Sequence, residues 1–472
     1  MSEEAADPPN IIWITLDSIR HDHTTLNGHT RPTTPNLERI ARKTRGVGFT
    51  NCIAAANWSL PSAASIHTGA FPERHRTGYG TNKLPQSVDT VAERLREQGY
   101  QTVGISANHY FSEATGLDRG FDTFKQINPK EFLKEVNPLT VLRFLYNVRS
   151  HSGGFTVEKT KHRPDFFVNE IVKKQLSSRA GSEEPFFLSA HYHGAHVPYY
   201  PPPAWKDRFA SDLIESPKAA SERAFRHTTD LHKGIANVSE FKERDWNALN
   251  VMYDTLIAYS DSLVGDLFDH MQSLDLDNTV FVVTADHGDL LGEYGLLGHK
   301  FVLHDGLVHV PAIVHGLDSV VGKADELVQH VDIMRTLVEY VGGDTTGLDG
   351  VDLRTGHRTA ALSQRGAGIQ EPISEIKGYN PSFNSDRLRD AAISSLRTHD
   401  FKYQHSAKGN ALFELPDEES DVSTKYPGRL DELETDLMGR LDRIDTEKID
   451  EERAEFSDDV RDHLSDLGYV VE

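Results

Sequence analysis

The chain has 472 residues, of which 38% are hydrophobic and 9% aromatic, so it can form one large domain with a smaller one. Its net charge of −22 disfavours nucleic acids and anionic membranes as partners, because both would repel such a surface. The only cysteine is Cys52, which excludes an intramolecular disulfide. Residues 1–10 lack the pattern of a signal peptide, and no apolar run approaches the roughly 20 residues of a membrane span. We therefore expect a cytoplasmic protein with no membrane span.

The first apolar run of the chain leads directly into a carboxylate. Residues Ile11–Leu16 are apolar and largely β-branched, which predicts a buried strand, and Asp17 follows at once. Thr34 before Pro35 indicates the start of a helix. Residues 47–53 then predict the next strand, so an alternation of strand and helix begins near the start of the chain.

A serine marks the next predicted helix start. Pro61 suits a first helical turn, and the small residues after it permit close packing. Ser59 is therefore expected at or near a helix N-terminus, where free N–H groups and the helix dipole favour an anion. The alternative is that Ser59 only caps the helix, and locally this is the simpler interpretation.

Histidines follow the next two predicted strands. The strand over 101–106 is followed by His109, and the strand over 185–191 leads into a loop with three histidines within six residues. These are His191, His193 and His196. Open α/β sheets place their chemistry at the carboxyl ends of strands, so these side chains are candidates for a site. Each could instead be an ordinary loop histidine, and we expect that of at least one.

Helices and two irregular segments separate these strands. Helices are predicted over 87–98, 164–176 and 245–273. Residues 125–160 and 205–245 show no clear period. We interpret both as peripheral insertions that shape the substrate pocket.

A second carboxylate follows the most apolar strand of the chain. Four consecutive apolar residues over 280–283 predict a strand buried on both faces, and Asp286 and His287 come just after it. Both side chains are good ligands for a divalent cation, although a pair that caps a helix in a solvated loop is the alternative. Lys300 follows, before a further strand over 308–314.

The order of these elements predicts the fold. Strands and helices alternate over about 10–345, which indicates an α/β fold with a large, mainly parallel (mixed) sheet sandwiched by helices. From about 346 the chain is more polar, with short alternating runs at 391–396 and 401–404, and it ends in two charged pieces that could be helical. We therefore predict a catalytic domain over 8–345 and a smaller C-terminal subdomain over 346–472 with an antiparallel sheet.

Several of these motifs, taken in order, resemble those of the sulfatase family within the alkaline phosphatase superfamily. The segment Ser59-Leu-Pro-Ser62 resembles the family's nucleophile motif, usually Cys-x-Pro-Ser-Arg or its Ser version. Asp286-His287-Gly288 resembles its metal-binding Asp-Asn/His-Gly, and His196-Val-Pro198 its His-x-Pro loop. Further similarities lie at Ile11–Arg20, Gly99–His109, Gly116–Asp122, Lys300 and 397–415. The resemblance covers roughly 10–125, 185–200, 250–315 and 390–416.

The resemblance implies a metal-dependent hydrolase of sulfate esters, a sulfuric ester hydrolase. The ligands of one divalent ion (Ca²⁺, or Mn²⁺ or Mg²⁺) would be Asp17, Ser59, Asp286 and His287. Ser59 would attack in line, Lys300 would hold the non-bridging oxygens, and His196 or His109 would protonate the leaving group. Transfer of a sulfuryl or phosphoryl group requires such positive charge and a positioned nucleophile. The partner would be an anionic sulfate or phosphate ester, sugar-linked esters included.

Three departures from the family pattern bear on the chemistry. Ser18 stands where the family often has a second Asp, which removes a hard oxygen ligand and keeps Mn²⁺ and Mg²⁺ beside Ca²⁺ as candidates. Ala63 stands where the family has an Arg that belongs to the signal for formylglycine formation, so formylglycine at residue 59 stays open. Gly265 stands where two-metal phosphodiesterases of the superfamily have a His, which favours one ion.

Two other functions remain open at this point. An unmodified Ser59 suits a phosphoseryl intermediate, so the alternative is a phosphomonoesterase, phosphodiesterase or phosphonate hydrolase. The second alternative is a non-catalytic member of the fold that binds an anion or a glycan. That second alternative is disfavoured by the presence of Asp17, Ser59, Asp286, His287 and Lys300.

Overall fold

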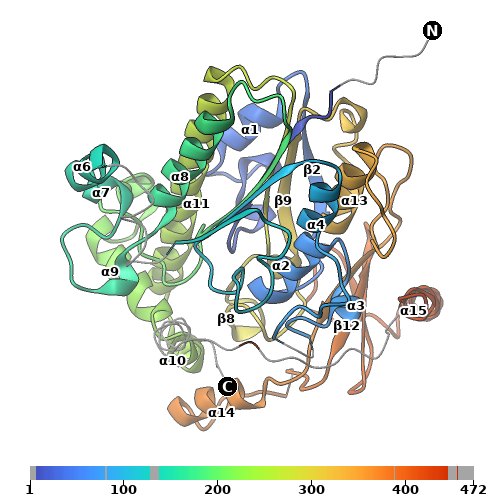
Figure 1. The fold of residues 1–472 in the computed structure, drawn as a ribbon. Helices are drawn as coiled ribbons and strands as arrows, with labels where there is room; N and C mark the ends of the chain where they lie inside the picture. Colours follow the sequence, from blue (N-terminus) through green and yellow to red (C-terminus); the bar gives the residue numbers. More distant parts are fainter. Residues whose placement is uncertain (1–6, 80–81, 128–137, 387, 445–453, 455–472) are drawn as a thin grey trace.

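The computed structural model describes residues 7–79, 82–127, 138–386, 388–444 and 454, and it centres on one large sheet (Figure 1). Within these residues, eight strands form this sheet in the order β10-β2-β9-β6-β1-β5-β3-β4. Their bounds are β1 (Asn10–Leu16), β2 (Gly46–Ile53), β3 (Gln101–Ser106), β4 (Thr123–Gln126), β5 (Phe186–Tyr192), β6 (Thr279–Ala285), β9 (His309–His315) and β10 (Leu327–Gln329). Strand β9 runs antiparallel to β2 and β6, and the other neighbouring pairs are parallel. The predicted mixed, mainly parallel sheet is confirmed.

Helices cover both faces of this sheet, which confirms the predicted sandwich (Figure 1). One side carries α1 (Pro35–Ala41), α8 (Asp165–Arg179) and α11 (Glu243–Ser273), and the other α2 (Ser59–Thr68), α4 (Val91–Glu97) and α13 (His330–Tyr340). None of the helices in the described part of the chain has the length and apolar character needed to cross a membrane. The cytoplasmic location expected from the sequence stays a prediction.

Helix α4 begins later than the sequence pattern indicated. The amide of Glu93 donates to Thr90 Oγ1 over 3.1 Å, and the amide of Thr90 donates to the Glu93 carboxylate over 2.7 Å. This capping box satisfies the first N–H groups of the helix and sets its start at Val91. The prediction of a helix from residue 87 is therefore wrong at its N-terminal end.

The two segments interpreted as insertions contain helices of their own. The first holds α6 (Pro138–Tyr146) and α7 (Val148–His151), whereas its residues 128–137 lie outside the described residues. The second holds α9 (Pro217–Thr228), which packs on α11, and α10 (Leu231–Ala236), which packs on α14 (Gln370–Tyr379). Helices of about one to three turns are too short for a repeating apolar pattern to stand out.

A second sheet follows the first, as expected for the C-terminal region. In the described residues it has four antiparallel strands, β11 (Ala361–Arg365), β12 (Ile393–Arg397), β13 (Phe401–Ser406) and β14 (Ala411–Glu414), with α15 (Pro427–Leu441) beside it. Further short elements are α3 (Pro72–His75), β7 (Leu290–Leu291), β8 (Leu297–Gly298) and α12 (Asp305–Val308). Buried Lys402 of β13 binds Asp305 over 2.7 Å and Glu418 over 2.8 Å, which ties the second sheet to α12. The domain boundary near 345 stays a prediction, and the last charged piece lies outside the described residues.

The central strands end together at one edge of the large sheet. Residues Val280–Val283 of β6 are fully buried, which explains the continuous apolar run. Leu16 of β1 pairs with Ala285 of β6 on one side and with Tyr192 of β5 on the other. The residues that follow these three strands therefore converge at this edge.

Candidate active site

Two buried carboxylates meet at the carboxyl ends of β1 and β6. Asp286 Oδ1 accepts hydrogen bonds from the amides of Ser18 over 3.2 Å and His287 over 2.8 Å, so it lies against the residue that follows Asp17. His191, near the end of β5, places Nε2 3.3 Å from Asp17 Oδ2 and 3.6 Å from Asp286 Oδ2. The imidazole thus lies between the two carboxylates.

The charges of this cluster fit a divalent cation. Burial and the neighbouring charge of Asp17 raise the pKa of Asp286 well above its usual range. Burial lowers the pKa of His191, but its hydrogen bond with Asp17 and the charge of Asp286 outweigh this and raise the pKa. Asp286 Oδ2 accepts no hydrogen bond from the described residues, although it is buried. Two carboxylates and an imidazole form a ligand set that fits a cation. A cation would also give Asp286 Oδ2 the partner that it lacks among the described residues.

His287 faces the predicted nucleophile. Its Nδ1 lies 2.8 Å from the carbonyl of Gly288, to which a protonated Nδ1 donates. The other nitrogen, Nε2, then carries a lone pair, and it lies 3.2 Å from Ser59 Oγ and 3.6 Å from Asp17 Oδ1. Ser59 is the first residue of α2, as the sequence predicted. The serine therefore lies beside the carboxylate pair, at the start of a helix.

Lys300 lies near the same helix start. Its Nζ is 4.8 Å from the ring centroid of Trp58, the residue before Ser59. Lys300 is the one described lysine with a positive φ, at 94°, a backbone conformation that costs energy for a side chain of this kind. Burial lowers the pKa of Lys300 to about 7. A half-buried ammonium beside the start of α2 can bind an anionic substrate more strongly than one in bulk water.

The histidine loop after β5 folds directly over Asp17. The amide of Ala195 donates to the carbonyl of Asp17 over 2.9 Å. Gly194 has φ of 58°, and a Cβ there would lie 2.2 Å from that same carbonyl oxygen, so only glycine fits. His196 Nδ1 lies 2.7 Å from the carbonyl of Val197. The ring of His196 is centred 5.3 Å from that of His299, so this predicted residue borders the cluster.

Sequence reasoning missed several members of this cluster. Asp289 accepts from Tyr199 Oη over 2.9 Å and contacts His299 Nδ1 over 2.7 Å, and the ring of His299 is centred 4.5 Å from that of His287. Burial raises the pKa of Asp289 to about 6. The available signals were positional, since Asp289 comes two residues after His287 and His299 directly precedes Lys300.

In the loop after β3, the side chain of Asn108 contacts the carboxylate of Asp17. Its Nδ2 donates to Asp17 Oδ2 over 2.8 Å, so it orients the carboxylate. Sequence reasoning selected the next residue, His109, as a candidate acid, and that role stays a prediction.

Gly265 packs against the start of α1, and the single ion expected from this position stays a prediction. Asp261 accepts from the amides of Asn36 over 3.0 Å and Leu37 over 2.8 Å, so this part of α11 caps α1. A Cβ on Gly265 would lie 2.4 Å from the Asn36 side chain, and close packing explains the glycine.

His287, Asp289 and His299 form another group with the spacing of metal ligands.

The sequence profile of the Sulfatase family matches residues 9–343. The chain belongs to the sulfatase family. This membership makes the protein a sulfatase-like hydrolase, and the matched range includes all the site residues described above. The predicted resemblance is confirmed.

Relatives of this sulfatase share its length but little of its sequence. An arylsulfatase of Clostridium perfringens is 25% identical over an alignment of 368 positions, which covers 70% of this chain and 74% of the relative. A phosphonate monoester hydrolase of Agrobacterium radiobacter superposes with a TM-score of 0.71 at 20% identity over 92% of this chain and 96% of the other. A solved structure in complex with its substrate D-glucosamine-2-N,6-O-disulfate has a TM-score of 0.66 at 19% identity, covering 93% and 99% of the two chains. These two structures confirm the fold.

Proposed function

We propose that this sulfatase is a metal-dependent hydrolase of sulfate esters in which residue 59 attacks the sulfur in line with the leaving group. The observation that carries the proposal is the position of Ser59 Oγ, 3.2 Å from His287 Nε2 and beside the buried pair Asp17 and Asp286. The ligands of the ion would be Asp17, Ser59, Asp286 and His287, with His191 as a further candidate. A bound divalent ion supplies positive charge that activates the hydroxyl and offsets charge on the ester oxygens.

The other side chains of the site serve the ester group. Lys300 would bind the non-bridging oxygens, where negative charge resides as the bond to the leaving oxygen lengthens. The N–H groups at the start of α2 add to this positive field. Asn108 holds Asp17 in place through its 2.8 Å hydrogen bond.

The leaving group needs a proton. His196 borders the cluster, with its ring 5.3 Å from that of His299 and its Nδ1 2.7 Å from the carbonyl of Val197. We propose His196 as the residue that donates this proton, with His109 as the alternative. Attack by residue 59 would form one sulfur–oxygen bond as its hydroxyl proton passes to a basic group of the site, and it would break the bond to the alcohol, which leaves with the proton from the histidine. Water would then cleave the ester formed on residue 59 and restore the enzyme.

A second candidate function is supported by the nucleophile itself. Ala63 replaces the Arg of the formylglycine signal, and an unmodified Ser59 suits phosphoryl transfer. A phosphonate monoester hydrolase has the same fold, which supports this alternative. The alternative is a phosphomonoesterase, phosphodiesterase or phosphonate hydrolase at the same site. One solved structure with the same fold contains its substrate, D-glucosamine-2-N,6-O-disulfate, so sulfated sugars are the first esters to test.

Mass spectrometry of the peptide that contains Ser59, with rates on aryl sulfate, phosphate and phosphonate esters, separates these functions. Formylglycine and a preference for sulfate would support the sulfatase, whereas an intact serine and a preference for phosphorus esters would favour the alternative. Chelation should abolish either activity, and returned Ca²⁺, Mn²⁺ or Mg²⁺ should restore it. Activity that survives complete metal removal would contradict the metal-dependent proposal.

A matched serine on the same helix provides the control. Ser65 Oγ lies 2.9 Å from Nε2 of His75 in α3, so a second buried serine of α2 contacts a histidine. We expect Ser59→Ala to abolish turnover and Ser65→Ala to retain it. Full activity in Ser59→Ala would remove residue 59 from the mechanism, and no turnover of any ester by the folded wild-type enzyme would leave the non-catalytic alternative.

A further inference from the structure

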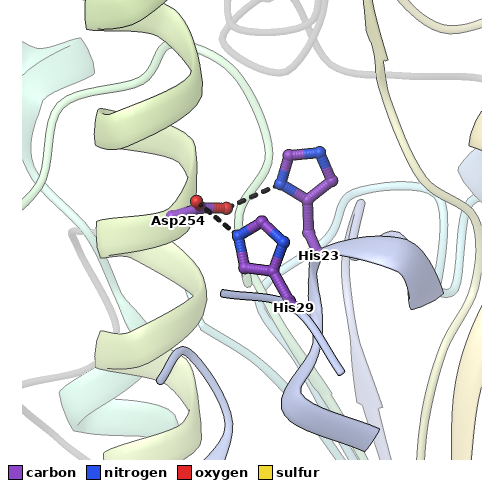
Figure 2. A group of neighbouring side chains, drawn as sticks. All are labelled: His23, His29 and Asp254. Atoms are coloured by element: carbon purple, nitrogen blue, oxygen red, sulfur yellow. Dashed lines mark hydrogen bonds and ion pairs between the residues drawn. The ribbon is translucent and has the colours of Figure 1, made fainter. Parts of the chain in front are cut away.

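A second group of histidines and a carboxylate lies against the middle of α11 (Figure 2). Figure 2 shows His23 and His29 both pointing toward the carboxylate of Asp254. His23 ends a short 3₁₀ helix (His21–His23), and His29 follows Gly28, whose φ of 74° turns the chain back toward α11. Three separate stretches of backbone thus supply one cluster.

The distances within this cluster are short. His23 Nδ1 lies 2.6 Å from Asp254 Oδ1, and His29 Nε2 lies 2.8 Å from Asp254 Oδ2. One ligand atom from each residue lies within 4.8 Å of the other two. Burial opposes ionisation of Asp254, but the hydrogen bonds from the two histidines outweigh it and lower its pKa to about 2. The three side chains therefore place one ligand atom each within reach of a single ion.

We propose that His23, His29 and Asp254 bind a divalent transition-metal ion of the zinc type, at a site separate from the active centre. Two imidazole nitrogens and a carboxylate oxygen are a donor set that Zn²⁺ accepts, with a fourth position left for water. Ligand atoms in a tetrahedral zinc site lie about 3.3 Å apart, from bonds of about 2.0–2.2 Å. The side chains would need only small movements, and the His29 side chain keeps 16% of its surface exposed, which provides a route of entry.

Arg31 is the group that competes with this ion. Its Nη1 lies 2.5 Å from Asp254 Oδ2, while its Nε lies 2.7 Å from Asp212 Oδ2. One guanidinium thus faces two carboxylates, so the acidic groups around Arg31 outnumber it. The contact with Asp212 lets Arg31 keep an acidic partner when an ion takes its place at Asp254. The electrostatics of the cluster therefore allow a cation.

The site would act on structure and not on the reaction. Tyr253, next to Asp254 on α11, donates to the carbonyl of Ser18 over 2.8 Å and accepts from the amide of Arg20 over 3.0 Å. The ion would add a second link between α11 and the segment that follows Asp17. Binding of zinc at this cluster would not depend on which ester the enzyme hydrolyses.

The proposal is tested by the number of zinc ions that the full chain binds. The protein is dialysed to equilibrium against Zn²⁺ alone, and its zinc content is then measured by elemental analysis. We expect His29→Gln to bind one equivalent less than the wild type, and Asp286→Asn to retain the equivalent that His29→Gln loses. His227→Gln is the matched control, because His227 Nε2 lies 3.0 Å from Asp245 beside Arg223 but belongs to no described three-ligand group. We expect it to bind as much zinc as the wild type. Equal zinc content in folded His29→Gln and wild type would overturn the proposal.

A second variant provides a spectroscopic test that a purely structural hydrogen bond would not affect. His29→Cys keeps a zinc ligand and introduces a thiolate, so it should retain the zinc and give a cobalt–thiolate charge-transfer band when Co²⁺ is added. Cys52 would not contribute, because it is buried and burial raises the pKa of its thiol. We also expect zinc to raise the melting temperature of the wild type by about 2–5 °C, and that of His29→Gln by less. Absence of the band in a folded His29→Cys protein would contradict the proposed ligand.

Discussion

The two histidine–aspartate clusters of this sulfatase differ in the balance of donors and acceptors. At the active centre Asp17 and Asp286 face each other, and Asp286 Oδ2 accepts no hydrogen bond from the described residues. At the outer cluster one carboxylate, that of Asp254, receives His23, His29 and Arg31. Two adjacent carboxylates are stabilised by a bound cation or by a proton, whereas one carboxylate with three donors is stable without either.

The pKa shifts of the two carboxylates have opposite signs for this reason. Burial and the charge of Asp17 raise the pKa of Asp286, whereas hydrogen bonds from histidines lower the pKa of Asp254 to about 2 despite burial. We therefore expect substitutions at the active centre to act on metal content and rate. Substitutions at the outer cluster should act on stability.

The largest effect is expected from Asp286→Asn. This change removes a charged ligand, so metal content and kcat/KM should fall together, the latter by about 10³-fold or more. Elemental analysis and kinetics on the best ester measure both. Normal content of the native ion in this variant would refute the ligand assignment and remove the contrast between the clusters.

A smaller effect is expected from the pH dependence set by Lys300. Burial lowers the pKa of Lys300 to about 7, so the ammonium is present below pH 7 and is lost as the pH rises through it. We expect the kcat/KM of the wild type to fall on the alkaline side of pH 7, and Lys300→Arg to lack this fall, because a guanidinium stays charged. Lys300→Ala should lower kcat by about 10²–10³-fold. An identical alkaline limb in the wild type and Lys300→Arg would exclude Lys300 as its cause.

The smallest effect is expected at the outer cluster. Without added metal, His29→Gln should lower the free energy of unfolding by about 1 kcal/mol, because one hydrogen bond to a buried carboxylate is lost. Its kcat should stay within about twofold of the wild type. Denaturant unfolding and steady-state kinetics measure the two quantities. A large loss of kcat with unchanged stability would mean that the outer cluster participates in the reaction.

Local patterns were enough to find the strand ends of the active centre. The apolar runs at Ile11–Leu16 and 280–283 are buried strands, and Asp17 and Asp286 follow them as predicted. The same reasoning placed Ser59 at the start of a helix. Each of these features depends on short segments whose composition is sufficient to define a strand or a helix terminus.

The partners of those residues could not be predicted in this way. His191 joins Asp17 because β5 lies beside β1, although 174 residues separate the two side chains along the chain. His299 and Asn108 enter the site through other loops, and the start of α4 depends on a reciprocal contact between Thr90 and Glu93. Contacts of this kind depend on the order in which strands assemble, which local composition does not determine.

The sequence by itself determined the fold class, the family motifs and the carboxylates that follow the buried strands, because apolar periodicity and residue type are properties of short segments. The tertiary structure decided which histidine lies between the carboxylates, which nitrogen of His287 faces Ser59, and that Asp261 caps a helix. It also assembled His23, His29 and Asp254 from a turn and a helix 225 residues apart. Those arrangements arise only when strands and helices pack, since a side chain's partners depend on the elements that packing brings beside it.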